Sequence, residues 1–199
     1  MNVLDRVFLK AFKFKPAKRV GVKFHTYTRN LPIIIDSLKP NQKVLDVGCG
    51  LGFTGEHLYK KGFSVTGLEL DSRLVEKVNK YTSYNVHNDS ADNMPFENEF
   101  FDSAIFMYVM HHIPPQKHLK VMQETARVLK KNGKVIIVEP DTKSQFDFVW
   151  DKIFFSKSFF GYFNLKGKYK LTKKGAMRFF EIKKEEIENI VFEYEGEVE

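Results

Sequence analysis

The fold of this chain is decided by Val44-Leu45-Asp46-Val47-Gly48-Cys49-Gly50-Leu51-Gly52. The first residues are mostly apolar and predict a buried strand, and three glycines at alternate positions follow it. Glycine tolerates positive φ and has no Cβ, so the backbone can turn tightly and a ligand can lie against it. Such a turn at the carboxyl end of a parallel strand serves nucleotide-like ligands. A purely structural turn is the alternative interpretation.

Strand and helix alternate along the chain as far as Pro140. Apolar runs predict five strands, and apolar residues at helical spacing predict the helices. The predicted strands are Lys43–Val47, Ser64–Leu70, Tyr84–His87, Phe101–Tyr108 and Lys134–Glu139. The predicted helices are Asn2–Phe14, Arg29–Leu38, Thr54–Lys61, a helix capped by Asp71 and reaching Tyr81, and Gln116–Leu129 with Leu119 facing inward. We expect an α/β fold with a Rossmann-like, doubly wound, mostly parallel sheet and helices on both faces.

A length of 199 residues favours one domain over two. Within it we expect an N-terminal helical cap over residues 1–40, a cofactor-binding core over 41–140, and an acceptor-side and C-terminal segment over 141–199. In that last segment the sequence predicts helices over Phe146–Phe160 and Lys183–Ile190 and a strand over Val191–Val198. Phe179–Ile182 fits either a short strand or the approach to the second helix.

The spacing of the glycines separates two kinds of cofactor. A dinucleotide-binding turn has the pattern G-x-G-x-x-G and holds a pyrophosphate at the N-terminus of the next helix. Here the third glycine, Gly52, comes one residue early, and Phe53 stands where the last glycine should be. Asp46 precedes the turn, and a carboxylate there is poorly suited to a pyrophosphate. It suits a ligand that carries an amino group and a sulfonium.

Asp46–Gly52 resembles the D-x-G-x-G-x-G loop of class I S-adenosylmethionine-dependent methyltransferases, and the chain looks like the small-molecule group known as methyltransferase type 11. The similarity covers residues 27–140. It continues in order through Glu69, Asp89, Met94–Ile105, the pair His111-His112 and the passage Arg127–Pro140. The resemblance implies transfer of a methyl group from S-adenosylmethionine to a small-molecule acceptor.

The resemblance also implies a set of cofactor-binding residues and no metal. The set is Asp46, Gly48, Cys49, Gly50, Gly52, Glu69, Leu70, Asp89, Ser90 and Met107. A carboxylate at Glu69 would accept both ribose hydroxyls, and the family places an acid such as Asp89 near the adenine amino group. Both acids also fit helix caps or loop charges. Asp102 is predicted to anchor backbone, and Cys49 to be a small packing residue rather than a reactive thiol.

His111 and His112 are the candidate catalytic residues. The family's reaction displaces a methyl group from a sulfonium, so much of the protein's work is alignment of the acceptor. An oxygen acceptor must also lose a proton, and a histidine near neutral pKa is suited to remove it. The alternative is a histidine pair that only caps the loop between strand and helix. Adjacent residues there are expected to face different ways.

The two segments that form the acceptor side in the family, residues 1–30 and 141–180, are basic and rich in Phe. The first 30 residues hold eight Lys or Arg and one acid, a net charge of +7 that equals the excess of the whole chain. These segments fit an apolar or lipid-like acceptor, and the basic start fits peripheral contact with a membrane. A core that covers the sheet and a solvated charged surface are the alternatives.

Two other functions stay open. A nucleic-acid or protein methyltransferase fits the basic ends, but no Asn/Asp-Pro-Pro-Tyr/Phe tetrapeptide follows the fourth strand, so nucleic acid is not an expected partner. A catalytically silent cofactor-binding regulator or subunit is the other. The family has two strands after the fifth, and only Val191–Val198 is evident here, so the sheet is predicted to lack its last antiparallel strand or the sequence to be truncated. The single cysteine fits a cytoplasmic protein, and the sequence does not specify an oligomeric state.

Overall fold

The computed structural model describes residues 30–140, 163–174 and 177–194. Its strands are β1 (Lys43–Val47), β2 (Ser64–Glu69), β3 (Asn85–Asn88), β4 (Phe101–Met107), β5 (Leu129–Pro140), β6 (Phe163–Lys166), β7 (Lys170–Lys174), β8 (Met177–Lys183) and β9 (Val191–Tyr194). Its helices are α3 (Phe53–Lys60), α4 (Ser72–Tyr81) and α5 (Pro115–Val128), the 3-10 helices η1 (Met110–His112) and η2 (Lys184–Asn189), and a helix over residues 30–37.

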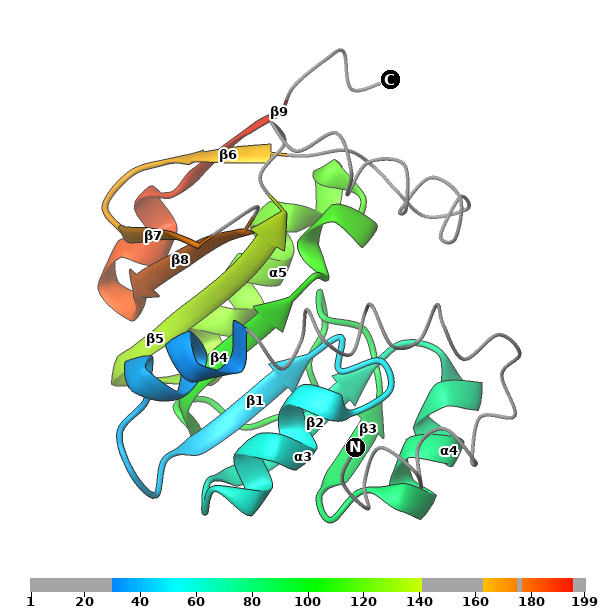
Figure 1. Cartoon of the computed structure of the whole chain (residues 1–199). Helices are drawn as coiled ribbons and strands as arrows, with labels where there is room; N and C mark the ends of the chain where they lie inside the picture. Colours follow the sequence, from blue (N-terminus) through cyan, green and yellow to red (C-terminus); the bar gives the residue numbers. More distant parts are fainter. Residues whose placement is uncertain (1–29, 141–162, 175–176, 195–199) are drawn as a thin grey trace.

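Seven strands form one sheet in the order β3-β2-β1-β4-β5-β8-β7 (Figure 1). β1 to β5 are parallel, β8 runs antiparallel to β5, and β7 runs antiparallel to β8. β6 and β9 pair in a separate two-stranded antiparallel sheet. The predicted Rossmann-like α/β class is confirmed. The five predicted core strands correspond to β1–β5, although β5 begins earlier than predicted, at Leu129.

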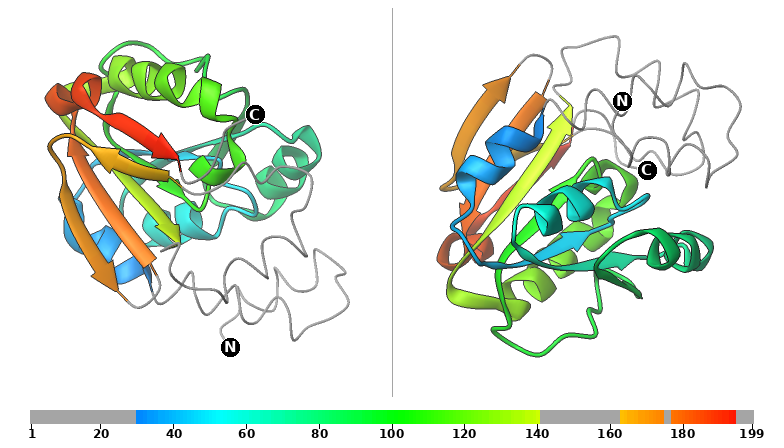
Figure 2. Two further views of the ribbon diagram at one scale, coloured as in Figure 1. Left: turned by 90° about the horizontal axis from the view of Figure 1, so that it is seen from above. Right: turned by 60° about the horizontal axis from the view of Figure 1, so that its bottom comes forward.

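Helices cover both faces of the sheet. Alternate side chains of a strand point to opposite faces, so Ile105 and Val138 belong to the apolar layer under the helix of residues 30–37, α3 and α4. Phe106 and Ile137 belong to the layer under α5 and η2. Figure 2 shows α3 and the helix of residues 30–37 on one side of the sheet and α5 on the other. Because both faces are covered, the central strands are apolar throughout.

The start of α4 follows its sequence signal, and so does the buried face of α5 except at one residue. The side chain of Asp71 accepts a hydrogen bond from the backbone N–H of Arg73 at 2.9 Å, as expected of a helix cap. Leu119 was predicted to face inward, and this is wrong, because 59% of it is exposed. Val121, Met122 and Val128 are buried, and the same face of α5 includes the polar residues His118 and Thr125.

The prediction that the sheet lacks its last antiparallel strand is wrong. β8 is inserted antiparallel beside β5, and Phe179–Ile182, which fitted two interpretations, lies within it. β8 shows no clean alternation of polar and apolar residues because both of its faces are buried. The strand predicted over Val191–Val198 begins at Val191 as β9, but it pairs with β6 and not with the main sheet. The helix predicted over Lys183–Ile190 is the short 3-10 helix η2.

Two predicted helices, Asn2–Phe14 and Phe146–Phe160, lie outside the described residues. Within the described ranges, no helix is long and apolar enough to cross a membrane.

The place of β8 in the core can be tested by truncating a buried and an exposed side chain on neighbouring strands. Phe180 on β8 is buried, whereas its cross-strand neighbour Leu171 on β7 is partly exposed. We expect Phe180→Ala to lower the free energy of unfolding by about 3–5 kcal/mol, and Leu171→Ala to lower it by less than about 1 kcal/mol. Urea unfolding measures both, and equal losses would place β8 outside the core.

Candidate cofactor and acceptor site

The glycine turn between β1 and α3 is a tight backbone loop that only glycine can form. Gly48, Gly50 and Gly52 all have positive φ, at 64°, 54° and 73°. A Cβ on Gly48 would lie 2.6 Å from Val109 Cγ1, and one on Gly52 would lie 2.7 Å from Val78 Cγ1, so both positions are closely packed. At Gly50 the nearest heavy atom would be 4.0 Å away. Among the described residues, no side chain therefore covers the middle of the turn, and a ligand can approach the backbone there.

Glu69 holds the turn from the neighbouring strand. It ends β2, and its carboxylate accepts hydrogen bonds from the backbone N–H of Gly50 at 2.9 Å and of Asp71 at 3.0 Å. Beside it, Leu70 is 71% exposed, which is unusual for a leucine at the end of a core strand. The arrangement sets a carboxylate and an apolar side chain side by side next to Gly50. The role of Glu69 toward ribose hydroxyls stays a prediction.

Asp46 is a buried carboxylate with an unmet hydrogen-bonding requirement. It is 1% exposed, and within the described part of the chain its Oδ2 has no hydrogen-bond partner. Burial raises the pKa of Asp46 to about 7, and the nearby charge of Glu69 adds to the rise, while the backbone N–H of Gly55 opposes it. A buried polar atom without a partner is costly. A ligand with a donor or a positive charge at this turn would relieve that cost, so the donor set fits the predicted kind of cofactor.

Three other predicted cofactor residues lie around the same edge of the sheet. Asp89 and Ser90 follow β3, whose last residue Asn88 pairs with Glu69. Met107 ends β4 and is buried, and its sulfur accepts a hydrogen bond from the Thr54 hydroxyl at 3.1 Å. Met107 thus packs under the first turn of α3.

Cys49 lies inside the turn and is partly buried. Burial, together with the charge of Asp46, raises the pKa of its thiol. A protonated thiol is a poor nucleophile, which agrees with the predicted packing role.

The loop after β4 carries the two candidate catalytic histidines. His111 is 2% exposed, and its Nδ1 forms a hydrogen bond with the carboxylate of Glu139, which is also buried. The ring of His112 is partly exposed, and its centroid lies 4.0 Å from that of His111. If Nδ1 donates to the carboxylate, Nε2 is the basic nitrogen of a neutral His111 ring.

Glu139 is a site residue that the sequence analysis missed. Besides His111, its carboxylate accepts hydrogen bonds from the backbone N–H groups of Val109 at 3.2 Å and Met110 at 2.9 Å. It therefore fixes both the loop and the orientation of one histidine. The available signal was an acid at the end of an otherwise apolar strand, directly before Pro140.

The helix of residues 30–37 reaches the same loop. The side-chain amide of Asn30 donates to the hydroxyl of Tyr108 at 2.5 Å. Tyr108 has a positive φ of 61°, which is strained for a residue with a bulky side chain. The described end of the N-terminal segment thus lies at the loop of residues 108–114, which carries His111 and His112 and is called the histidine loop below.

Asp102 lies at the opposite end of the sheet. Its carboxylate accepts hydrogen bonds from the backbone N–H of Lys43 at 2.8 Å and from Lys130 Nζ at 2.7 Å. Partial burial opposes ionisation, but these bonds and the charge of Lys130 together outweigh it and lower the pKa of Asp102. They tie the starts of β1, β4 and β5 together, as the predicted anchoring role requires.

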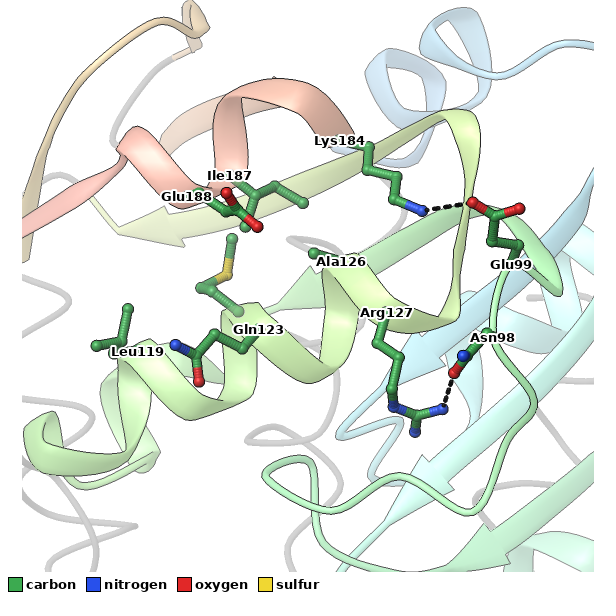
Figure 3. Close-up of a pocket in the computed structure, with 10 residues that line it drawn as sticks. Asn98, Glu99, Leu119, Gln123, Ala126, Arg127, Lys184, Ile187 and Glu188 are labelled. Carbon is green, nitrogen blue, oxygen red and sulfur yellow. Dashed lines mark hydrogen bonds and ion pairs between the residues drawn. The ribbon is translucent and has the colours of Figure 1, made fainter.

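A hollow of about 750 Å³ between α5 and η2 is separate from the glycine turn (Figure 3). Its rim carries two polar links, Lys184 with Glu99 at 3.3 Å and Arg127 with Asn98 at 2.9 Å. Asn98 and Glu99 come just before β4, whereas the turn follows the end of the parallel strand β1. The hollow therefore lies toward the other end of the sheet from the candidate site.

The fold and this edge of the sheet define the class of α/β domains that hold a nucleotide-like cofactor at the carboxyl ends of parallel strands. The comparison with known proteins gives the family. Residues 45–137 match the family described as "Methyltransferase domain", and the chain carries a domain of the class I S-adenosylmethionine-dependent methyltransferases. S-adenosylmethionine is the cofactor of that family.

Individual relatives agree with this family. The sterol 4-C-methyltransferase strm-1 of Caenorhabditis elegans is 32% identical over 156 residues, which are 73% of this chain and 46% of the relative. A demethylmenaquinone methyltransferase of Thermotoga maritima is 30% identical over 150 residues, 72% of this chain and 63% of the relative. The chain thus covers less than two thirds of these curated relatives. The crystal structure of the PH0226 protein from Pyrococcus horikoshii shares the fold, with a TM-score of 0.66, 22% identity, and coverage of 80% of this chain and 90% of that one.

The raised pKa of Asp46 predicts a pH-dependent effect of Asp46→Asn. The folded protein keeps a proton on Asp46 that the unfolded chain releases, so this group destabilises the fold increasingly as pH rises from about 4 to 7. We expect the free energy of unfolding of Asp46→Asn, relative to wild type, to rise by roughly 2–4 kcal/mol across that range.

Urea unfolding without cofactor at several pH values measures this difference. Asp71→Asn is the control, because the partner Arg73 lowers the pKa of Asp71 and no rise is expected there. A difference between Asp46→Asn and wild type that does not change with pH would contradict the prediction.

Proposed function

We propose that this chain transfers a methyl group from S-adenosylmethionine to a small-molecule acceptor. The observation that supports this most directly is the buried Oδ2 of Asp46, which has no hydrogen-bond partner among the described residues, beneath a turn whose middle glycine no described side chain covers. An empty structural turn would have no reason to keep a carboxylate oxygen there. The family match of residues 45–137 supplies the chemistry that fits this arrangement.

The residues around the turn are suited to hold such a cofactor. Glu69 would accept hydrogen bonds from the ribose hydroxyls while its carboxylate still holds the N–H of Gly50. The exposed Leu70 offers an apolar surface to the adenine ring of the cofactor. Asp89 offers an acceptor for the amino group of that ring. Asp46 and the backbone of Gly48 would lie toward the methionine part of the cofactor. When bound, the cofactor supplies a methyl group on a positively charged sulfur that a nucleophile can displace.

His111 and His112 would orient the acceptor and take up its proton. Glu139 keeps His111 in one tautomer and stabilises its protonated form, as a buried carboxylate next to an imidazole does. The same carboxylate holds the loop through Val109 and Met110, so the position of the histidines is set by β5. Alignment of this kind supplies a large part of the rate in a displacement reaction.

An apolar, lipid-like acceptor fits best. Residues 141–162 follow β5 in the sequence, beginning two residues after Glu139, and hold six Phe and one Trp. In the sequence this segment thus follows Glu139, whose carboxylate holds the histidine loop. The names of two relatives point to acceptors of this kind, a sterol and a demethylmenaquinone. The alternative of a catalytically silent regulator has lost its main support, because β7 and β8 complete the sheet.

Cofactor binding tests the proposal. We expect the wild type to bind S-adenosylhomocysteine in a calorimetric titration and to refuse NAD. Glu69→Ala removes a charged acceptor of the ribose hydroxyls and should weaken binding at least tenfold, as the loss of about 1.5–3 kcal/mol implies. Glu76→Ala is the matched control, since Glu76 is exposed on α4 and pairs only with Lys80 among the described residues. A folded wild type that does not bind, or equal affinity of both variants, contradicts the assignment.

Methyl transfer tests the role of the histidine loop. The protein is incubated with a panel of candidate acceptors, sterols and quinols with apolar tails. The label transferred from S-adenosylmethionine to each acceptor is measured. His111→Gln and His112→Gln are compared with His57→Gln on α3. If a histidine is the base, we expect its variant to lose roughly 10²–10⁴-fold in kcat while the affinity for S-adenosylhomocysteine stays unchanged. Full activity of both loop variants would exclude these histidines as the base.

A further inference from the structure

A third histidine, His118, lies behind the histidine loop. It is buried on the first turns of α5, and its Nε2 lies 2.9 Å from the carbonyl oxygen of Met110 and 3.0 Å from that of Ile113. Carbonyl oxygens only accept hydrogen bonds, so Nε2 carries the proton. Met110 begins η1 and Ile113 follows it, so His118 holds both ends of the short turn that carries His111 and His112.

The other nitrogen of His118 connects to a distant part of the chain. Its Nδ1 lies 2.8 Å from the hydroxyl of Tyr194 on β9. With the ring proton on Nε2, Nδ1 accepts, and the Tyr194 hydroxyl donates to it in preference to the carbonyl oxygen of Pro115, which is farther away at 3.4 Å. Burial lowers the pKa of His118, which keeps the ring neutral, and raises the pKa of Tyr194 to about 12, which keeps its proton. Both shifts favour this direction of the hydrogen bonds.

The two-stranded sheet holds these groups in place. Phe163 of β6 pairs with Tyr194 in the ladder, and the rings of Phe163 and Phe192 lie 5.6 Å and 4.8 Å from the ring of His118. The aromatic rings pack against His118 and leave it few alternative positions. A polar side chain in such surroundings is retained only if its hydrogen bonds are made.

Two side chains thus hold the histidine loop, one as a hydrogen-bond acceptor and the other as a donor. Glu139 accepts from the N–H groups of Val109 and Met110, and His118 donates to the carbonyl groups of Met110 and Ile113. We propose that Tyr194 and His118 are positioning residues, through which the β6–β9 sheet sets the conformation of the loop carrying His111 and His112. The consequence for catalysis rests on the proposed function. The hydrogen-bonded connection from Tyr194 through His118 to the loop, called the tie below, does not.

Amide hydrogen exchange on the cofactor-free full chain tests the tie. The reporters are the N–H groups of His112 and Ile113, which donate within the turn to Val109 at 2.8 Å and Met110 at 3.0 Å. Tyr194→Phe removes only the hydroxyl, and we expect about two- to tenfold faster exchange at both reporters, with amides of β1 and β4 unchanged. Tyr169→Phe is the matched control, because it also loses one hydroxyl near β6, bonded at 2.7 Å to the carbonyl of Leu165.

A double-mutant cycle distinguishes a hydrogen-bonded connection through both residues from independent packing of each residue. His118→Phe keeps an aromatic ring but loses both connections, and it should accelerate the same reporters at least as much as Tyr194→Phe. Because the two residues act in series, adding Tyr194→Phe to His118→Phe should have no further effect. Additive effects, unchanged reporters, or a uniform acceleration of all amides would overturn the proposal.

Titration with S-adenosylhomocysteine separates this proposal from the proposed function. We expect Tyr194→Phe to bind it as the wild type does. On an acceptor found in the panel, the variant should lose kcat and keep its KM for S-adenosylmethionine, and an unchanged kcat would overturn the catalytic consequence. A wild type that binds no cofactor but shows the exchange effect would refute methyl transfer and leave the tie intact.

Discussion

The close approach of Gly48 to Val109 is the constraint on which the rest of this site depends. A Cβ at Gly48 would lie 2.6 Å from Val109, so the glycine turn after β1 and the loop after β4 pack directly against each other. The turn faces the candidate cofactor position, and the loop carries the candidate catalytic histidines. Their contact fixes the separation of the two halves of the site, which a displacement between two bound molecules needs.

The carboxyl edge of the sheet concentrates buried polar groups that the two apolar layers would not tolerate. Asp46, His111 and Glu139 are all buried there, and Tyr108 adopts a strained positive φ. At the opposite edge, Asp102 is satisfied by a lysine and a backbone N–H, and it fixes strand ends only. Buried titratable groups thus gather at the carboxyl edge, whereas the carboxylate of Asp102 at the other edge is partly exposed and paired. That asymmetry is the usual mark of a functional site.

The sequence predicted the parts of the molecule whose signals are local. Three glycines after an apolar strand, and Asp71 before α4, each act on neighbouring backbone and were interpreted correctly. For β8 the sequence left two interpretations open, because burial on both faces removes the alternation of polar and apolar residues that marks a strand. Glu139 and Tyr194 were missed because their partners lie 28 and 76 residues away, and no spacing in the sequence announces such contacts.

The polar ties of the histidine loop also have a reason in backbone chemistry. A single 3-10 turn leaves backbone N–H and carbonyl groups at its ends that no regular ladder satisfies, and in a buried position each needs a partner. Glu139 supplies the acceptor for the N–H groups at the start, and His118 supplies the donor for the carbonyls of Met110 and Ile113. An apolar residue in place of Glu139 would remove the acceptor of the Met110 N–H, and one in place of His118 would remove the side-chain donor to the Ile113 carbonyl. The loop can therefore hold a fixed conformation at the carboxyl edge of the sheet, because side chains of β5 and α5 provide hydrogen-bond partners that its own backbone does not.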